Sequence, residues 1–240
     1  MFYAFGPFIS AIGLTLYHRG RFGIKSLLRP ILKWRVGSVW YACALAIPII
    51  AQWLALGLWR SWTGYGVKLP SPADAAQTWL IATPVIAAFI VTEETGWRGF
   101  ALPRLQSCSK ALSASLVLGV CWSFWHFPLE IAIEHASGES AKTILLSLAL
   151  FTASTMLFSV LMTWIFNSSS GSLLLMLLMH GSNNASLFIV ADALGQGGDV
   201  DLTFRVFYML SLLFLVSVVL LGYGTKSISK SYKITFESLH

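Results

Sequence analysis

Charged residues are scarce in this sequence: Asp, Glu, Lys and Arg together make up only 11% of the 240 residues. A typical soluble domain is about 25% charged, so the composition argues against a protein folded in water. Cysteine is also scarce, with only Cys43, Cys108 and Cys121. Their spacing forms neither a disulfide framework nor a cysteine-based metal motif. We therefore expect them to be small buried hydrophobic side chains.

Hydrophobic residues are abundant instead, at 56% of the chain. Seven stretches approach the roughly 20 residues that a helix needs to cross a bilayer. They are residues 2–17, 38–58, 78–100, 111–129, 143–166, 172–192 and 203–222. The chain contains no long linker, low-complexity tract or obvious internal repeat. The sequence therefore predicts an all-α, polytopic membrane helix bundle of about seven transmembrane helices, in one integral membrane domain over residues 1–240.

The net charge of +6 is unevenly distributed along the chain. If the seven spans alternate in direction, most basic residues fall on one side of the membrane: Arg19, Arg21, Lys25, Arg29, Lys33, Arg35, Arg104, Lys110, Lys226, Lys230 and Lys233. The other side receives most acidic residues: Asp74, Glu130, Glu134, Glu139, Asp192, Asp199 and Asp201. Excess Lys and Arg mark the cytoplasmic side. We expect an outer N-terminus, a cytoplasmic C-terminus and a contact with the lipid bilayer, and no nucleic-acid partner.

Two basic segments lie outside the predicted spans. Residues 22–35 interleave apolar and basic residues, which fits an amphipathic segment on the membrane surface as well as an ordinary basic loop. The basic cytoplasmic tail, residues 224–240, is polar and expected to be mobile.

The adjacent carboxylates Glu93 and Glu94 end an apolar run inside the third predicted span. A charged side chain at membrane depth costs about 2.5–3.5 kcal/mol on insertion scales, so both groups need a partner or a use. Glu94 is four residues before Arg98, which places both on one helical face and predicts an ion pair. Glu93 is rotated by about 100° from Glu94 and projects into a different space.

Three further polar residues lie inside apolar spans: His126 in the fourth span, and His180 and Asn184, four residues apart, in the sixth. The helical rise places these groups and Glu93 at comparable depths of roughly 12–20 Å. Convergence at that depth requires a hydrated cavity inside the bundle. A carboxylate, two imidazoles and an amide suit hydrolysis of an acyl bond, with Glu93 as general base and His180 and Asn184 as oxyanion donors. No Ser or Cys stands obviously beside a base, which favours direct attack by water.

These residues form three motifs, Glu-Glu-x-x-x-Arg at 93–98, Trp-x-x-x-His at 122–126 and His-x-x-x-Asn at 180–184. Their order on separate apolar helices resembles the CAAX prenyl protease and bacteriocin-processing family of intramembrane proteases, related to the Ras-converting enzyme. The resemblance covers about residues 75–192. It implies that Glu93, His126, His180 and Asn184 are catalytic and that Glu94 and Arg98 are supporting. Trp122 stands where the family often has Phe.

Several alternatives remain open from the sequence. Glu93, His126 and His180 are compatible with a Zn²⁺ site, so a zinc-dependent protease competes with the metal-independent one that we favour. A membrane transporter or an immunity scaffold of the same fold is the non-enzymatic alternative. Trp97, Trp122 and Trp125 flank the site and are expected to line it. The expected substrate is a peptide or protein, membrane-associated or prenylated in one branch of the family, and the expected location is a bacterial plasma membrane.

Overall fold

The computed structural model describes residues 5–195, 201–230 and 233–239, and every regular element within them is helical. The long helices are α1 (Gly6–Leu28), α2 (Ser38–Thr63), α3 (Pro72–Glu94), α5 (Ala111–Ala136), α6 (Ala141–Ser168), α7 (Leu173–Leu194) and α8 (Leu202–Tyr223). The shorter elements are η2 (Arg29–Leu32), η3 (Thr95–Ala101), α4 (Leu102–Cys108) and η4 (Glu237–Leu239). The predicted all-α bundle is confirmed.

Local sequence signals explain where four of these helices begin. The side chains of Ser71, Ser140, Ser172 and Asp201 each accept a hydrogen bond from a backbone N–H in the first turn of the following helix. Such N-caps satisfy donors that a helix start leaves unpaired. Ser172 caps the sixth predicted span in this way.

Six helices within the described residues are long and apolar enough to cross a membrane: α2, α5, α6, α7, α8 and the continuous segment Pro72–Cys108 that joins α3, η3 and α4. Helix α1 is not among them. Its apolar part, residues 6–17, is about 18 Å long at about 1.5 Å per residue, whereas a bilayer core is about 30 Å thick. Residues 2–4 of the first predicted span lie outside the described residues. The predicted outer N-terminus depended on that span, and it stays a prediction.

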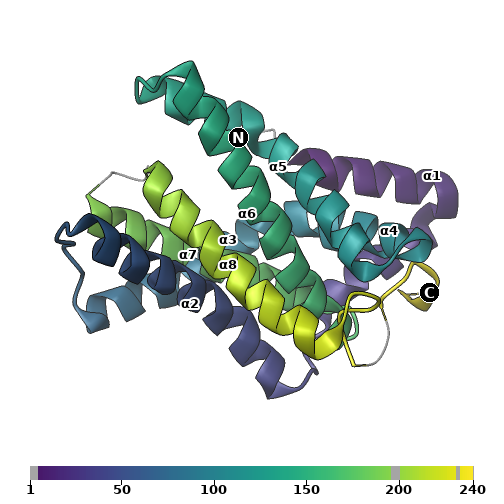
Figure 1. The fold of residues 1–240 in the computed structure, drawn as a ribbon. Coiled ribbons are helices and arrows are strands. Elements are labelled where there is room, and N and C mark those ends of the chain that lie inside the picture. Colours follow the sequence, from purple (N-terminus) through teal and green to yellow (C-terminus); the bar gives the residue numbers. More distant parts are fainter. Residues whose placement is uncertain (1–4, 196–200, 231–232, 240) are drawn as a thin grey trace.

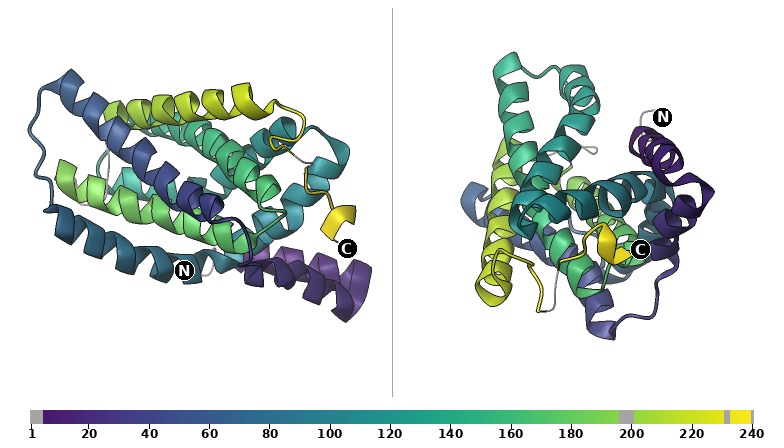
Figure 2. Two further views of the ribbon diagram at one scale, coloured as in Figure 1. Left: turned by 90° about the horizontal axis from the view of Figure 1, so that it is seen from below. Right: turned by 90° about the vertical axis from the view of Figure 1, so that its right-hand side faces the viewer.

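Neighbouring helices form an open ring in which α5 packs on α6, α6 on α8, α8 on α2, α2 on α7 and α7 on α3. Figure 1 shows α6 and α8 crossing the front of the bundle, with α3 and α7 behind them. Helix α1 packs against η3 and α3, and both views in Figure 2 place it at the side of the bundle. The ring leaves an interior space between the α5–α6 hairpin and the α3–α7 pair.

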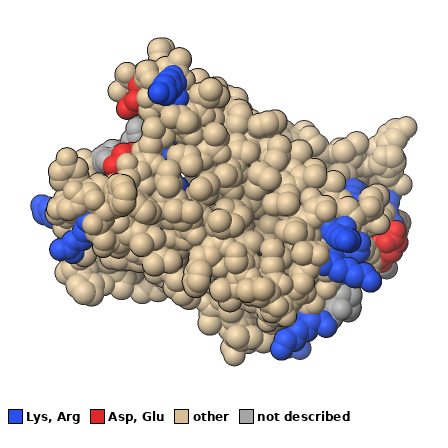
Figure 3. Space-filling model, in the orientation of Figure 1, with Lys and Arg blue, Asp and Glu red and all other residues tan. Residues whose placement is uncertain are grey.

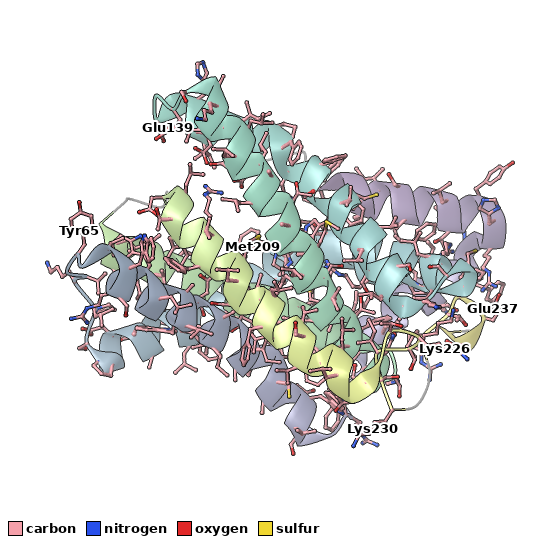
Figure 4. The ribbon with its side chains drawn as sticks, in the orientation of Figure 1. Tyr65, Glu139, Met209, Lys226, Lys230 and Glu237 are labelled. Carbon is pink, nitrogen blue, oxygen red and sulfur yellow. The ribbon has the colours of Figure 1, made fainter. Side chains whose placement is uncertain are left out.

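Charged side chains are concentrated near the ends of the bundle, and a broad uncharged surface separates them (Figure 3). Glu139 lies at the end formed by the α5–α6 turn, whereas Lys226 and Lys230 lie at the opposite end (Figure 4). Asp199, which the sequence assigned to the acidic side, lies outside the described residues. This distribution agrees with a multi-pass membrane protein whose uncharged belt faces lipid.

The described part of the C-terminal tail packs against α4 and α6. Ile228 and Ile234 are buried. Gln106 of α4 donates a hydrogen bond to the carbonyl of Ile234 at 2.9 Å, and Asn167 of α6 donates to the carbonyl of Ser227 at 2.7 Å. Polar side chains on α4 and α6 thus contact the tail backbone, and the expected mobility of the tail stays a prediction.

Candidate active site

A cavity of about 430 Å³ lies inside the helix ring, between the α5–α6 hairpin and helices α2, α3, α7 and α8. Four residues that the sequence singled out line it together: Glu93, His126, His180 and Asn184. They come from three helices and from positions up to 91 residues apart in the chain. The structure therefore brings these four residues together inside the bundle, as the sequence predicted.

Glu94 is the centre of a buried ion-pair network. Its carboxylate accepts hydrogen bonds from Nη1 of Arg98 at 2.9 and 3.2 Å, and both side chains are fully buried. This geometry agrees with the expected pair. The carboxylate also lies 2.9 Å from Nδ1 of His180, a contact that the sequence did not indicate. Because an ionised carboxylate only accepts hydrogen bonds, Nδ1 of His180 carries the proton in this contact. Nε2 is the ring nitrogen that does not contact Glu94.

Glu93 points into the cavity, as its helical phase predicted. Its side chain is 9% exposed, and Oε2 has no hydrogen-bond partner among the described residues. Nε2 of His126 lies 3.8 Å from this oxygen, which is longer than a hydrogen bond. Nδ1 of His126 is 3.0 Å from the carbonyl oxygen of Trp122 and donates to it, since a carbonyl accepts. The backbone thereby fixes the ring with Nε2 toward Glu93.

Trp122 packs between the two polar groups of the site. Its ring lies under the Arg98 guanidinium, 4.1 Å from the ring centroid. The same ring makes edge contacts with His180 at 5.1 Å and with His126 at 6.2 Å between centroids. One large aromatic side chain therefore supports both imidazoles and the cation that neutralises Glu94.

The motif helices approach one another closely because small residues face their neighbours. A Cβ at Gly181 would lie 2.6 Å from the carbonyl oxygen of Thr83 on α3. Only glycine allows this approach of α7 to α3, which brings His180 next to Glu94. Directly after Glu94 the backbone widens into the π-helical segment η3, and such bulges occur frequently at functional sites. Arg98 lies within η3 and still reaches Glu94.

Sequence reasoning missed part of the polar wall of the cavity. Gln52 of α2, Asn183 of α7 and Tyr208 of α8 also line it. The Tyr208 hydroxyl donates to Oδ1 of Asn183 at 2.7 Å, and Nδ2 of Asn183 donates to Oδ1 of Asn184 at 3.4 Å. Each is an uncharged polar residue within an apolar stretch, and none occupies a defining position of the three motifs, although Asn183 lies inside the His-x-x-x-Asn segment.

Other polar residues line the cavity further from Glu93. Ser154 and Thr155 come from α6, and Glu130 and Arg205 come from the ends of α5 and α8. Arg205 forms ion pairs with Glu130 at 3.4 Å and with Glu134 at 2.9 Å. These pairs join α5 to α8 at the same end of the bundle as Glu139.

The three tryptophans expected at the site behave differently. Trp122 lines the cavity, whereas Trp97 and Trp125 are not among its lining residues. Trp97 packs against the main hydrophobic core. The Trp125 ring faces Gly6 of α1.

A zinc site at Glu93, His126 and His180 was the cofactor alternative. Within the described residues, no group of three His, Cys, Asp or Glu side chains is arranged to hold a metal ion. Nδ1 of His180 contacts Glu94, so Nε2 is the ring nitrogen that His180 could offer to a metal, and a carboxylate contact of this kind is common at metal-binding histidines. As placed, the three residues are not brought together as a metal-ligand group among the described residues.

Comparison with known proteins supports the motif-based resemblance. Residues 75–186 match the family described as type II CAAX prenyl endopeptidase Rce1-like. Over 88 residues the chain is 32% identical to CAAX prenyl protease 2 of Methanococcus maripaludis, which corresponds to 37% of this chain and 32% of that protein. The match thus spans about a third of the relative's length. Through residues 75–186, which carry the three motifs, the chain is similar to the Rce1-like type II CAAX prenyl endopeptidases.

Proposed function

We propose that this protein is an intramembrane endopeptidase that hydrolyses a peptide bond with water activated by Glu93. The observation that carries the proposal is the buried, unpartnered Oε2 of Glu93, which faces His126 in a cavity that His180 and Asn184 also line. A buried carboxylate is costly inside a membrane, and a hydrated cavity offsets that cost. The relationship to CAAX prenyl endopeptidases favours peptide hydrolysis over transport or a scaffold role.

The distance between Glu93 and His126 suits one bound water. A water that hydrogen-bonds to both Oε2 and Nε2 fits across their 3.8 Å separation. Glu93 takes a proton from this water as the water oxygen attacks the substrate carbonyl carbon. The proton then passes to the departing amine nitrogen as the C–N bond breaks. The products are a carboxylic acid and an amine, and Glu93 returns to its ionised form.

The oxyanion of the tetrahedral intermediate needs hydrogen-bond donors. Oδ1 of Asn184 accepts from Asn183, so its Nδ2 is the atom that donates to the oxyanion. His180 holds a proton on Nδ1 against Glu94, and its Nε2 donates only when the ring becomes an imidazolium. The contact with Glu94 orients the His180 ring, much as a carboxylate orients the catalytic histidine in other hydrolases.

The substrate is proposed from the cavity and the relative. The walls around the polar groups are largely apolar, with Ile90, Leu129, Ile133, Leu150, Phe151 and Phe188 among them. Such walls favour a peptide with apolar side chains near the cleaved bond. The curated relative is named a CAAX prenyl protease, so a prenylated peptide belongs among the first substrates to test. Secreted or membrane-bound peptides with similarly apolar side chains are the second group of substrates to test.

The membrane orientation follows from charge. We propose that the protein resides in a bacterial plasma membrane with the end that carries Lys226 and Lys230 in the cytoplasm. With six spanning helices, the basic segment before α2 and the tail after α8 lie on that same side.

The test compares the purified protein with Glu93→Gln in cleavage of a quenched fluorescent peptide library that includes prenylated members. We expect the variant to lose about 10²–10⁴-fold in rate, the usual contribution of a general base. The matched control is Glu139→Gln, an exposed carboxylate at the end of the bundle, which should cleave like the wild type. If the wild type cleaves nothing, a transporter or immunity scaffold becomes the better interpretation. If Glu93→Gln cleaves at the same rate as the wild type, Glu93 is not the base.

The zinc alternative is tested in the same assay. We expect a chelator to leave the cleavage rate unchanged. Loss of activity that added Zn²⁺ restores would contradict metal-independent chemistry and would require the site to rearrange from the one described.

A further inference from the structure

Gln52 is a fully buried amide whose hydrogen-bonding capacity is unused. Its side chain in α2 is 0% exposed, and neither Oε1 nor Nε2 has a partner among the described residues. More than nine in ten buried polar groups in proteins are hydrogen-bonded, because an unpaired one loses its interaction with water without replacement. Gln52 also lines the cavity that holds Glu93 and His180. Its amide therefore has no protein partner, and a group bound in the cavity can supply one.

Gln106 is a buried glutamine of the same protein whose amide oxygen and nitrogen both have hydrogen-bond partners. It is also 0% exposed. Its Nε2 donates to Oδ1 of Asn167 at 3.1 Å and to the Ile234 carbonyl at 2.9 Å. Its Oε1 accepts from Nδ2 of Asn167 at 2.8 Å. The contrast indicates that burial does not by itself leave a glutamine unpaired in this fold.

The neighbouring amides on the cavity wall are already engaged with one another. The Tyr208 hydroxyl and Asn184 occupy the two ends of the Asn183 amide. Gln52 belongs to a different helix and is left out of this chain of hydrogen bonds. Its hydrogen-bonding capacity is consequently unused, whereas Asn183 serves to hold Asn184.

A primary amide presents one acceptor and two donor hydrogens in one plane. This set complements a backbone peptide group, which offers one N–H and one C=O. A phosphate or carboxylate ligand would need a cation beside it, and the cation that lines this cavity, Arg205, is already paired with Glu130 and Glu134. A neutral, amide-bearing ligand is the better match.

We propose that Gln52 forms a substrate-binding subsite that hydrogen-bonds a backbone peptide group of the bound peptide next to the cleaved bond. The subsite rests on the proposed peptidase function and specifies how that function recognises its substrate. Gln52 contacts the substrate backbone, so it contributes to affinity for any peptide sequence. It transfers no proton in the reaction.

The test uses Gln52→Met, which keeps the length of the side chain and removes its hydrogen-bonding atoms, with Gln106→Met as matched control. For Gln52→Met we expect KM for a cleaved peptide to rise about tenfold, the effect of one or two lost hydrogen bonds, with kcat nearly unchanged. We expect its Tm to equal or exceed that of the wild type, because no internal hydrogen bond is lost. Gln106→Met should lower Tm and leave KM unchanged.

A second measurement separates this proposal from the peptidase function. Affinity for a labelled peptide is measured in the Glu93→Gln background, where cleavage is not needed for the signal. Weaker binding in Glu93→Gln/Gln52→Met than in Glu93→Gln supports the subsite even if no cleavage is found. Equal binding, or a fall in Tm as large as that of Gln106→Met, overturns the proposal, since either result means that the amide has no role with the peptide.

Discussion

Glu94 determines the geometry of the site more than any other residue, although it does not face the cavity. It joins Arg98 of η3 to His180 of α7 through hydrogen bonds of 2.9 Å each. Removing one partner of a buried ion pair costs about 3–5 kcal/mol, because the remaining charge stays buried without compensation. Arg98 is fully buried, so the stability of the bundle and the orientation of His180 depend on the same carboxylate.

We therefore expect Glu94→Gln to lower stability strongly and to reduce cleavage even though Glu93 is intact. The measurement is thermal unfolding in detergent followed by tryptophan fluorescence. Glu130→Gln is the comparison, since Glu130 pairs with Arg205 at 3.4 Å where the side chains are 18% and 14% exposed. A partly exposed pair is worth about 1 kcal/mol or less, so its variant should unfold close to the wild type. Similar Tm values for the two variants would contradict the buried network.

Tyr208 acts on the site through two amides. Its hydroxyl donates to Asn183, which donates to Asn184, and this order leaves Nδ2 of Asn184 for the oxyanion. Tyr208→Phe removes the hydroxyl and keeps the ring. We expect kcat to fall several-fold with KM unchanged, since an oxyanion donor acts mainly in the transition state. Tyr65→Phe, at a ring that is 69% exposed, is the control; an unchanged kcat in Tyr208→Phe would show that Asn184 needs no such orientation.

Motif spacing predicted the separate directions of Glu93 and Glu94, because a charged side chain inside an apolar helix must face either a partner of opposite charge or a polar cavity. It could not predict that Glu94 contacts His180 across two helices, since that contact depends on how closely α3 and α7 pack. Gln52 and Tyr208 were missed for a related reason. A single uncharged polar residue in an apolar helix is common, and only the position of the cavity distinguishes these two.

Helix packing in this protein depends on glycines at contact points. Helix α5, which carries His126, approaches α6 so closely that a Cβ at Gly119 would lie 2.5 Å from Cα of Met156. Gly57 of α2 offers a contrast, because nothing lies within 4 Å of its Cβ position. The α5–α6 hairpin forms one side of the cavity, so its spacing controls the distance from His126 to Glu93.

Gly119→Ala is expected to force α5 and α6 apart and to destabilise the bundle by about 1–3 kcal/mol, the usual cost of overpacking. Gly57→Ala should be neutral or slightly stabilising, since alanine is the better helix former. Chemical or thermal unfolding in detergent measures both variants. If Gly119→Ala is as stable as Gly57→Ala, the two helices adjust freely and do not fix the position of His126.

Sequence periodicity predicted the helices far better than their irregularities. The spans appeared from composition alone, because a bilayer demands long apolar segments. The π-helical segment Thr95–Ala101 was not predicted. The spacing of apolar residues at 3.6 per turn does not indicate that one helical turn contains an additional residue. The packing of α1 on this segment, with Pro7 against Gly96, was likewise invisible. A short apolar helix beside a bundle has the same composition as a short membrane span.

The two ends of the molecule differ, because the cavity extends from Glu93 toward the acidic end of the bundle. The lining continues through Ile133 of α5 and Arg205 of α8, which lie near the acidic end where Figure 4 shows Glu139. The opposite end carries Lys226 and Lys230, and there side chains of α4 and α6 hold the tail backbone. The orientation of the chain in the membrane therefore decides from which side a peptide reaches Glu93.

Cysteine labelling determines that orientation. In a background with Cys43, Cys108 and Cys121 replaced by serine, Glu139→Cys and Lys230→Cys place one thiol near each end of the bundle. We expect a membrane-impermeant maleimide to label Glu139→Cys in intact cells and Lys230→Cys only after permeabilisation, because basic segments stay in the cytoplasm. The cysteine-free parent controls for background. This pattern implies that the cavity receives peptides from the outer side, whereas the reverse pattern would contradict the charge rule and direct the search to cytoplasmic substrates.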